Sequence, residues 1–179
     1  MGHLHGWRTC PRCGAPLEHG HERATCAACG SVFYANAAPT AGALVEDEQG
    51  RVMLARRAHD PFAGMWDIPG GFLGEDEHPL DAVVRELREE TGLEIEPGAF
   101  LGCWLDVYGE GGEAARTTLN LYWLARATGG EAHPADDVAE LAWFAPDELP
   151  PPEELAFTQV ADVLSAWRRR RAKADEPSD

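Results

Sequence analysis

The sequence predicts an α/β fold, a sandwich of helices around a mixed sheet, with a small separate unit in front of it. Short apolar runs typical of strands stand on both sides of one central amphipathic helix at residues 79–91. A second helical pattern closes the chain at residues 152–172. Residues 1–37 differ from the rest, because they contain two Cys-x-x-Cys-Gly motifs and few apolar residues.

The two cysteine motifs place four thiols at two sharp turns, namely Cys10, Cys13, Cys26 and Cys29. Four thiolates suit tetrahedral Zn²⁺, and the glycine after each pair frees the backbone there. Two disulfides or four reduced thiols are the alternatives. Disulfides are disfavoured in the cytosol, and a segment this short has too few apolar residues to fold without a staple. We therefore predict that residues 1–37 bind a structural zinc ion.

Length and charge limit the classes of function. At 179 residues the chain can bury one good core plus a small appendage. No apolar run approaches the roughly 18 residues of a membrane span, and the N-terminus lacks the apolar region of a secretory signal. We therefore expect a cytoplasmic protein without a membrane partner. The net charge of −16 argues against a nucleic-acid partner but not against phosphate substrates, because bound divalent cations reverse the local field.

The strands are predicted from apolar runs bounded by turn residues. The expected strands cover residues 40–46, 51–57, 99–108, 117–127 and 141–144. The first two are joined by a hairpin-like turn at residues 47–50, and the next pair by a glycine-rich loop. Cys103 lies in an apolar stretch without an apparent histidine partner, so we expect a small buried residue rather than a nucleophile.

Both helices show an apolar face at helical spacing. In the central helix this face consists of Leu80, Val83, Val84 and Leu87. Pro79 suits the first turn, and Gly92 suits the C-terminal cap. The inner side of the last helix is expected to consist of Leu155, Val160, Val163, Leu164 and Trp167. We expect residues 38–172 to form one domain and residues 173–179 a disordered tail.

The central helix also carries an acidic face. Glu86, Glu89 and Glu90 stand at i, i+3 and i+4, so their like charges repel one another. Such crowding is explained if a hard divalent cation lies among them, since Mg²⁺ and Mn²⁺ prefer oxygen ligands. The Pro-Gly-Gly turn before the helix could bring backbone carbonyls to the same ion. An ordinary solvated acidic face is the alternative.

The full spacing carries a family resemblance. Gly71 is followed after five residues by Glu77, and after seven more by Arg85-Glu-Leu-Arg-Glu-Glu-Thr-Gly-Leu93. In this stretch the sequence resembles the Nudix hydrolase family, over roughly residues 38–170. The resemblance implies an α/β/α Nudix fold with a mixed sheet. It also implies Mg²⁺- or Mn²⁺-dependent hydrolysis of a nucleoside diphosphate linked to another group.

The resemblance assigns roles to individual residues. Glu86, Glu89 and Glu90 are implied to be metal ligands, with the carbonyl of Gly70 as a further ligand. Any of these glutamates could also lie near the attacking water. Arg85 resembles the residue that orients Glu86 by a salt bridge.

Two further acidic positions follow from the same resemblance. Glu77 is either metal-associated or part of the helix start. Many family members supply one more acid from a loop after the last long strand. Asp137 matches that position best, and Glu140 is the second candidate.

Residues 1–37 resemble the zinc ribbon of some Nudix hydrolases, including NADH diphosphatase-type and ADP-ribose diphosphatase-type members. That likeness implies a structural role or a homodimer contact. The NADH diphosphatases carry a Ser-Gln-Pro-Trp-Pro-Phe-Pro motif after the box, and here residues 102–110 read Gly-Cys-Trp-Leu-Asp-Val-Tyr-Gly-Glu. ADP-ribose or a related small nucleotide is therefore favoured over NADH.

Two other functions are alternatives: a nucleotide-sensing module and an RNA-directed, decapping-type hydrolase. The aromatic residues that could stack on a base, or else belong to the core, are Trp104, Tyr108, Tyr122 and Phe157.

Overall fold

The computed structural model of the chain describes residues 3–109 and 115–174. Its backbone divides into two compact units, one of residues 1–38 with 107–118 and one of residues 39–106 with 119–179. Each unit has its own sheet or sheets and its own buried side chains. The described part of the chain contains no helix both long and apolar enough to cross a membrane.

The N-terminal unit is built around a three-stranded antiparallel sheet in the order β1-β2-β3. A short 3₁₀ helix, η1 (His3–Gly6), precedes β1 (Glu18–His19), β2 (Arg23–Thr25) and β3 (Val32–Tyr34). In each cysteine turn the glycine has a positive φ and donates its N–H to the first cysteine's carbonyl, at 2.8 Å for Gly14 and 2.9 Å for Gly30. The predicted glycine role at both turns is confirmed.

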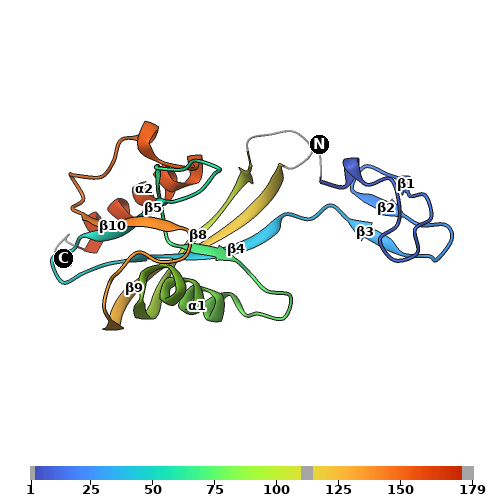
Figure 1. The fold of residues 1–179 in the computed structure, drawn as a ribbon. Coiled ribbons are helices and arrows are strands. Elements are labelled where there is room, and N and C mark those ends of the chain that lie inside the picture. The colour runs from blue at the N-terminus through green and yellow to red at the C-terminus, as the bar shows by residue number, and fades with distance from the viewer. Residues whose placement is uncertain (1–2, 110–114, 175–179) are drawn as a thin grey trace. The chain divides into compact units, whose positions relative to one another are not determined.

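The larger unit contains two sheets (Figure 1). The four-stranded sheet has the order β7-β4-β9-β8, from β7 (Gly70–Phe72), β4 (Ala38–Val45), β9 (Arg116–Gly130) and β8 (Leu93–Tyr108). The second sheet has the order β10-β5-β6, from β10 (Val138–Phe144), β5 (Val52–Arg57) and β6 (Trp66–Asp67). The predicted hairpin-like turn at residues 47–50 is confirmed, because the Asp47 N–H bonds the Arg51 carbonyl at 3.0 Å and Glu46 pairs antiparallel with Val52. Beyond this turn, β4 and β5 continue in different sheets.

The four-stranded sheet is mixed. β7 pairs antiparallel with β4, with Gly42 opposite Gly70. Thr40 bonds Asn120, and Glu46 N–H bonds the Ala125 carbonyl, so β4 and β9 run in the same direction. The mixed sheet that the sequence predicted is confirmed.

Two helices pack on the strands, α1 (Pro79–Thr91) and α2 (Thr158–Ala174), the second preceded by η3 (Pro152–Glu154). Alternate residues of a strand point to opposite faces. In β4, Ala43 and Val45 belong to the core cluster beneath α1, whereas Leu44 belongs to the cluster beneath α2. The sheet therefore has one helix packed on each face, which is the sandwich predicted from the sequence.

Several local predictions need correction. The bounds of α1 and the burial of Val83 and Leu87 were predicted correctly, but Leu80 and Val84 are each 38% exposed. The helix buries Ala82, which was not predicted. The last helix begins at Thr158 rather than at residue 152, although its predicted inner side is buried. Cys103 is exposed on β8, an edge strand, so the prediction that this cysteine is buried was wrong. Residues 175–179 of the predicted tail lie outside the described residues.

Candidate active site

Local sequence signals position α1. The His78 side chain accepts a hydrogen bond from the Leu80 N–H at 3.3 Å and caps the N-terminus of the helix. Gly92 ends the helix in the left-handed region, with φ 71°, and its N–H bonds the Arg88 carbonyl at 3.1 Å. The acidic face is therefore fixed in rotation at both ends.

Gly70 and Gly71 begin strand β7 and lie directly against this acidic face, so the Pro-Gly-Gly segment predicted as a turn is partly a strand. A Cβ at Gly70 would lie 2.4 Å from the Ala41 carbonyl oxygen, and a Cβ at Gly71 would lie 2.5 Å from Oε1 of Glu86. Side chains at either position would collide with strand β4 or with the carboxylate. Gly71 thus leaves the space in which the Glu86 carboxylate lies, and Gly70 allows the close approach of β4.

Arg85 connects three carboxylates. Its Nε and Nη2 donate to the two oxygens of Glu77 at 2.7 and 2.8 Å. Its Nη1 donates to Glu86 at 2.8 Å and to Glu89 at 3.0 Å. The hydrogen bonds from Arg85, followed by the N–H of Gly74, lower the pKa of Glu77 to about 2. Arg85 therefore holds the carboxylates of Glu77, Glu86 and Glu89 close together.

Glu90 is the most buried acid of the cluster, with 7% of the residue exposed. Its carboxylate accepts a hydrogen bond from the Gly70 N–H at 2.8 Å. Burial, and then the negative charge of Asp137, raises the pKa of Glu90 to about 9. Burial also raises the pKa of Glu86. A divalent cation would compensate these desolvated charges, and its oxygen donors are present in this group.

The two candidate loop acids lie in different surroundings. Residue Asp137 follows a segment tied to the end of α1, where the Ala135 N–H bonds the Glu90 carbonyl at 3.0 Å. Its charge acts on Glu90. Glu140 instead forms an ion pair with Arg56 at 3.0 Å on a half-exposed part of β10. Of the two candidates, Asp137 is the one whose charge acts on Glu90, whereas Glu140 pairs with Arg56.

Asp67 is an acid near this group that the sequence did not single out. Its side chain is 14% exposed, accepts from the Ile68 N–H at 2.8 Å and pairs with Arg57 at 3.3 Å. Burial raises the pKa of Asp67 to about 6 against the opposing effect of Arg57. The sequence signal that could have identified Asp67 is an aspartate inside a short apolar segment just before the two glycines.

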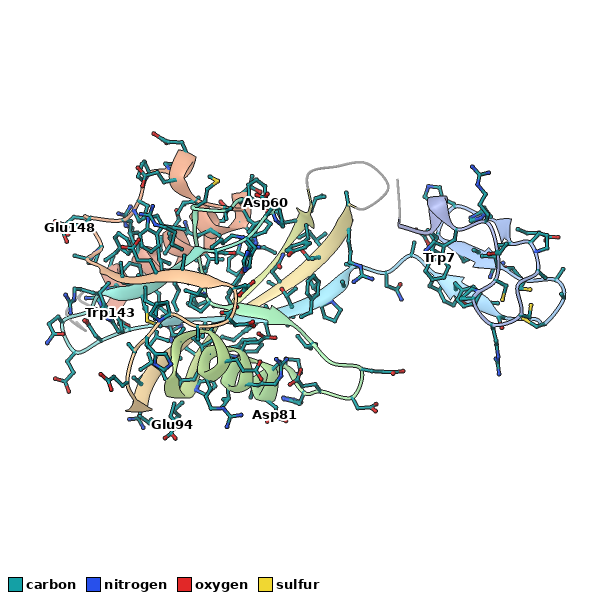
Figure 2. The ribbon with its side chains drawn as sticks, viewed as in Figure 1. Trp7, Asp60, Asp81, Glu94, Trp143 and Glu148 are labelled. Atoms are coloured by element: carbon teal, nitrogen blue, oxygen red, sulfur yellow. The ribbon has the colours of Figure 1, made fainter. Side chains whose placement is uncertain are left out.

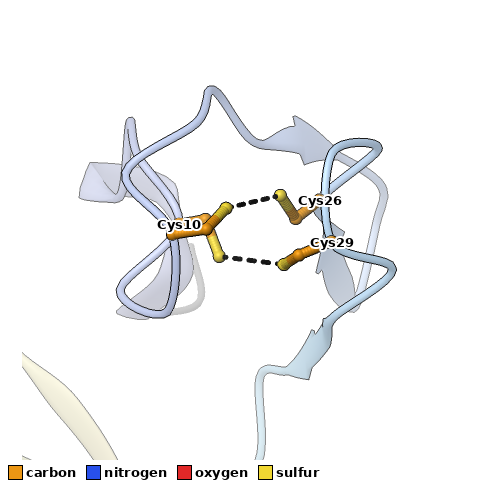
Figure 3. A group of neighbouring side chains, drawn as sticks. Cys10, Cys26 and Cys29 are labelled. Atoms are coloured by element: carbon orange, nitrogen blue, oxygen red, sulfur yellow. Dashed lines mark hydrogen bonds between the residues drawn. The ribbon is translucent and has the colours of Figure 1, made fainter.

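The cysteine group is more compact than the glutamate group. The four thiol sulfurs lie within 4.8 Å of one another. Among the described residues, no other set of three or more cysteine, histidine or acidic ligand atoms is gathered as closely. Two sulfur–sulfur contacts join the two turns, Cys10 to Cys29 at 3.7 Å and Cys13 to Cys26 at 3.5 Å (Figure 3). Four converging sulfurs match the ligand set of a structural Zn²⁺.

The comparison with family models decides the classification. Residues 37–167 match the model of the NUDIX domain. The chain belongs to the Nudix family. The zinc ribbon resemblance is consistent with the four-cysteine cluster.

Relatives and solved structures agree with the Nudix assignment. The chain is 32% identical over 126 residues to the ADP-ribose pyrophosphatase of Methanocaldococcus jannaschii, covering 70% of each protein. It is 30% identical over 176 residues to the NAD-capped RNA hydrolase NudC of Pseudomonas aeruginosa, covering 95% of this chain and 59% of that one. A Nudix hydrolase from Nitrosomonas europaea has the same fold, with a TM-score of 0.77 at 22% identity over 96% of this chain and 95% of that one.

Proposed function

We propose that this Nudix pyrophosphohydrolase cleaves the diphosphate of a small nucleoside diphosphate linked to another group, with ADP-ribose as the favoured substrate. The observation that carries the proposal is the position of Glu90, buried against the Gly70 N–H with Asp137 nearby. Buried like charges of this kind are costly unless a cation compensates them. The glutamate face therefore suits cation binding better than it suits solubility.

The metal ligands that we propose for Mg²⁺ or Mn²⁺ are Glu86, Glu89, Glu90 and the carbonyl of Gly70. A bound divalent ion would neutralise phosphate charge and lower the pKa of a coordinated water. Arg85 would hold Glu86 and Glu89 in the correct orientation, because its guanidinium bonds both carboxylates. Asp137 is the proposed additional acid, because its charge acts on Glu90.

The four cysteines are proposed to bind one structural Zn²⁺. Reduced thiols of this kind suit a reducing compartment, so we place the enzyme in the cytoplasm. We also propose a homodimer through the N-terminal unit, as its resemblance to the zinc ribbon of other Nudix hydrolases implies.

The substrate proposal is supported by the ADP-ribose pyrophosphatase relative, of which the chain covers 70%. NADH, or an NAD-capped RNA, is the second candidate, because the likeness to NudC extends over 95% of this chain. The chain spans only 59% of that relative. The net charge of −16 also opposes a long RNA partner.

The test is a panel of ADP-ribose, NADH, nucleotide sugars, nucleoside triphosphates and NAD-capped RNA, assayed with Mg²⁺ and with Mn²⁺. We expect Glu89→Gln and Glu90→Gln to lower kcat by about 1,000-fold or more, since metal clamping contributes several kcal/mol to such reactions. Asp81→Asn is the control, because this exposed acid lies on the same helix outside the cluster (Figure 2). Full activity of both glutamine variants, or in EDTA, would refute the proposal.

A further inference from the structure

The side of the four-stranded sheet that carries α1 has an exposed apolar area on its outer strands. β8 is an edge strand of this sheet, and Leu105 and Phe100 on it are 67% and 50% exposed. The Phe100 ring meets the ring of Trp123 on the neighbouring strand β9, with centroids 5.1 Å apart. Trp123 packs against the core cluster beneath α1, so Phe100 lies on that side of the sheet. Exposed apolar side chains that gather in one area indicate an interaction surface.

Alternation along β8 places Leu105 and Cys103 on the α1 side as well. Trp104 packs with the core cluster beneath α2, so its neighbours Cys103 and Leu105 point to the other side of the sheet. Leu101 also packs with the α2 cluster, and Gly102, with a φ of 147°, lies where the alternation shifts by one residue. The Cys103 side chain is exposed. The strand therefore presents a row of exposed, uncharged side chains on the side that carries α1.

The flank of α1 that faces these strands is apolar too. Leu80 and Val84 are i,i+4 neighbours on the helix, and each is 38% exposed. Val84 lies two residues before Glu86, and residues two apart on a helix point to nearly opposite sides. Glu86 faces β7, because its carboxylate lies against Gly71. Since β7 and β8 are the two edges of the sheet, Leu80 and Val84 face toward β8.

This surface is uncharged in a strongly acidic chain. Residues 98–105 of β8 and 117–125 of β9 contain no Asp, Glu, Lys or Arg, although the chain carries a net charge of −16. Burial explains the absence of charge toward α2, but it does not explain it on the exposed side. Exposed edge strands are usually protected by charged side chains, which this part of β8 lacks. We call the following group of residues the β8 face: Leu80, Val84, Phe100, Cys103, Leu105 and Trp123.

We infer that the β8 face binds the same face of a second copy of this chain. Two copies that each carry a charge of −16 repel one another, so their association is favoured where acids are absent from the contact. The β8 face meets that condition, whereas a basic partner is attracted to the acidic remainder of the surface. A two-fold axis through one apolar face brings like side chains together without a second, complementary surface. Burial of Leu105 and Phe100 in this contact removes them from water.

The contact lies in the larger unit. It is therefore separate from the homodimer proposed through the N-terminal unit, and it does not depend on which substrate the enzyme cleaves.

Sedimentation equilibrium over a range of protein concentrations tests the inference. We expect the wild-type protein to self-associate. Leu105→Asp places like charges close to the two-fold axis and should weaken this association by roughly 100-fold or more. Ala127→Asp adds the same charge at an exposed position of β9 outside the β8 face, so it is the matched control and should associate as the wild type does. Should Leu105→Asp not fold, Val84→Asp makes the same test from α1.

The thiol of Cys103 reports where the contact lies. Its alkylation by iodoacetamide is followed by mass spectrometry of the peptide that contains it. The reaction should slow as the wild-type protein associates and should stay fast in Leu105→Asp. Cys26→Ser, in which only the N-terminal unit is expected to unfold, should still self-associate through the β8 face.

Four results would overturn the inference. They are a wild-type protein that stays monomeric, a Leu105→Asp variant that associates like the wild type, a Cys103 thiol that stays equally reactive in the associated protein, and loss of all association in Cys26→Ser. None of these measurements uses turnover, so failure of the proposed function leaves this test intact.

Discussion

The cysteine group and the glutamate group are built in opposite ways. The four sulfurs already lie within 4.8 Å of one another, in a unit with few buried apolar side chains. The glutamates project from a helix that Val83 and Leu87 anchor in a separate core, and Arg85 and Gly70 hold their oxygens. The difference indicates that one metal ion would serve folding, whereas the other would serve chemistry on a frame that is stable without it.

The largest expected effect is on the cysteine side of this comparison. Cys26→Ser removes a buried sulfur of the cluster, and structural zinc contributes about 10 kcal/mol or more to the folding of small zinc units. We expect zinc content to fall from about one ion per chain to nearly none, with loss of the ordered Trp7 signal in near-ultraviolet circular dichroism. The unfolding transition of the larger unit should persist.

The control for that experiment is Cys103→Ser, which changes an exposed thiol on β8 and should leave zinc content unchanged. Retention of a full complement of zinc by Cys26→Ser would show that the two groups do not differ in the way described.

A second prediction concerns the glutamate side of the comparison and tests whether the burial of Asp67, an acid near the glutamates, lowers stability at neutral pH. Its folded-state pKa of about 6 exceeds the ordinary value of 3.8, so the stability that this group contributes is complete below pH 3.8 and is lost as the pH rises through 6. Asparagine imitates the protonated form at every pH. In EDTA, Asp67→Asn should therefore gain stability relative to wild type between pH 4 and pH 7, by up to about 3 kcal/mol.

Urea denaturation at several pH values measures this difference. Asp60→Asn is the control, because Asp60 is an exposed acid of the preceding loop (Figure 2). A stability difference between Asp67→Asn and wild type that does not change with pH would contradict the prediction.

The smallest expected effect concerns Arg85. Lysine keeps the positive charge but cannot bond Glu77, Glu86 and Glu89 together, because it lacks the planar fork of the guanidinium. We expect Arg85→Lys to lower kcat/KM or Mn²⁺ affinity by roughly 10- to 100-fold without loss of the fold. Kinetics and manganese titration by electron paramagnetic resonance provide the measurements.

Arg88→Lys, an exposed change one turn further along α1, serves as the matched control and should behave as wild type. If the two lysine variants prove equally active, Arg85 does not position the glutamates.

Local signals explain what was predictable from the sequence. The limits of α1 follow from Pro79 and Gly92, and the cysteine turns follow from their glycines, because these features act within a few residues of themselves. The α/β class was predictable from the order of strand and helix patterns. The Nudix box was predictable because its spacing lies almost entirely within one turn and one helix.

Tertiary contacts explain what was missed. The sequence could not show that β4 and β5 enter different sheets, because the turn between them suits either arrangement. It also could not show which apolar residues of α1 face the core, so Leu80 and Val84 were misassigned. Asp67 gains its significance only from burial near Asp137, which is distant in the sequence.

The arginine shared among Glu77, Glu86 and Glu89 has a consequence for the protein before it meets a cation. Those acids would otherwise repel one another and strain the helix, but the guanidinium already offsets part of their charge. We therefore expect the folded chain to persist when a chelator removes the proposed cation, and to regain activity when the ion is supplied again. The concentration of available ion, rather than refolding, would then set how much of the enzyme population works at a given moment.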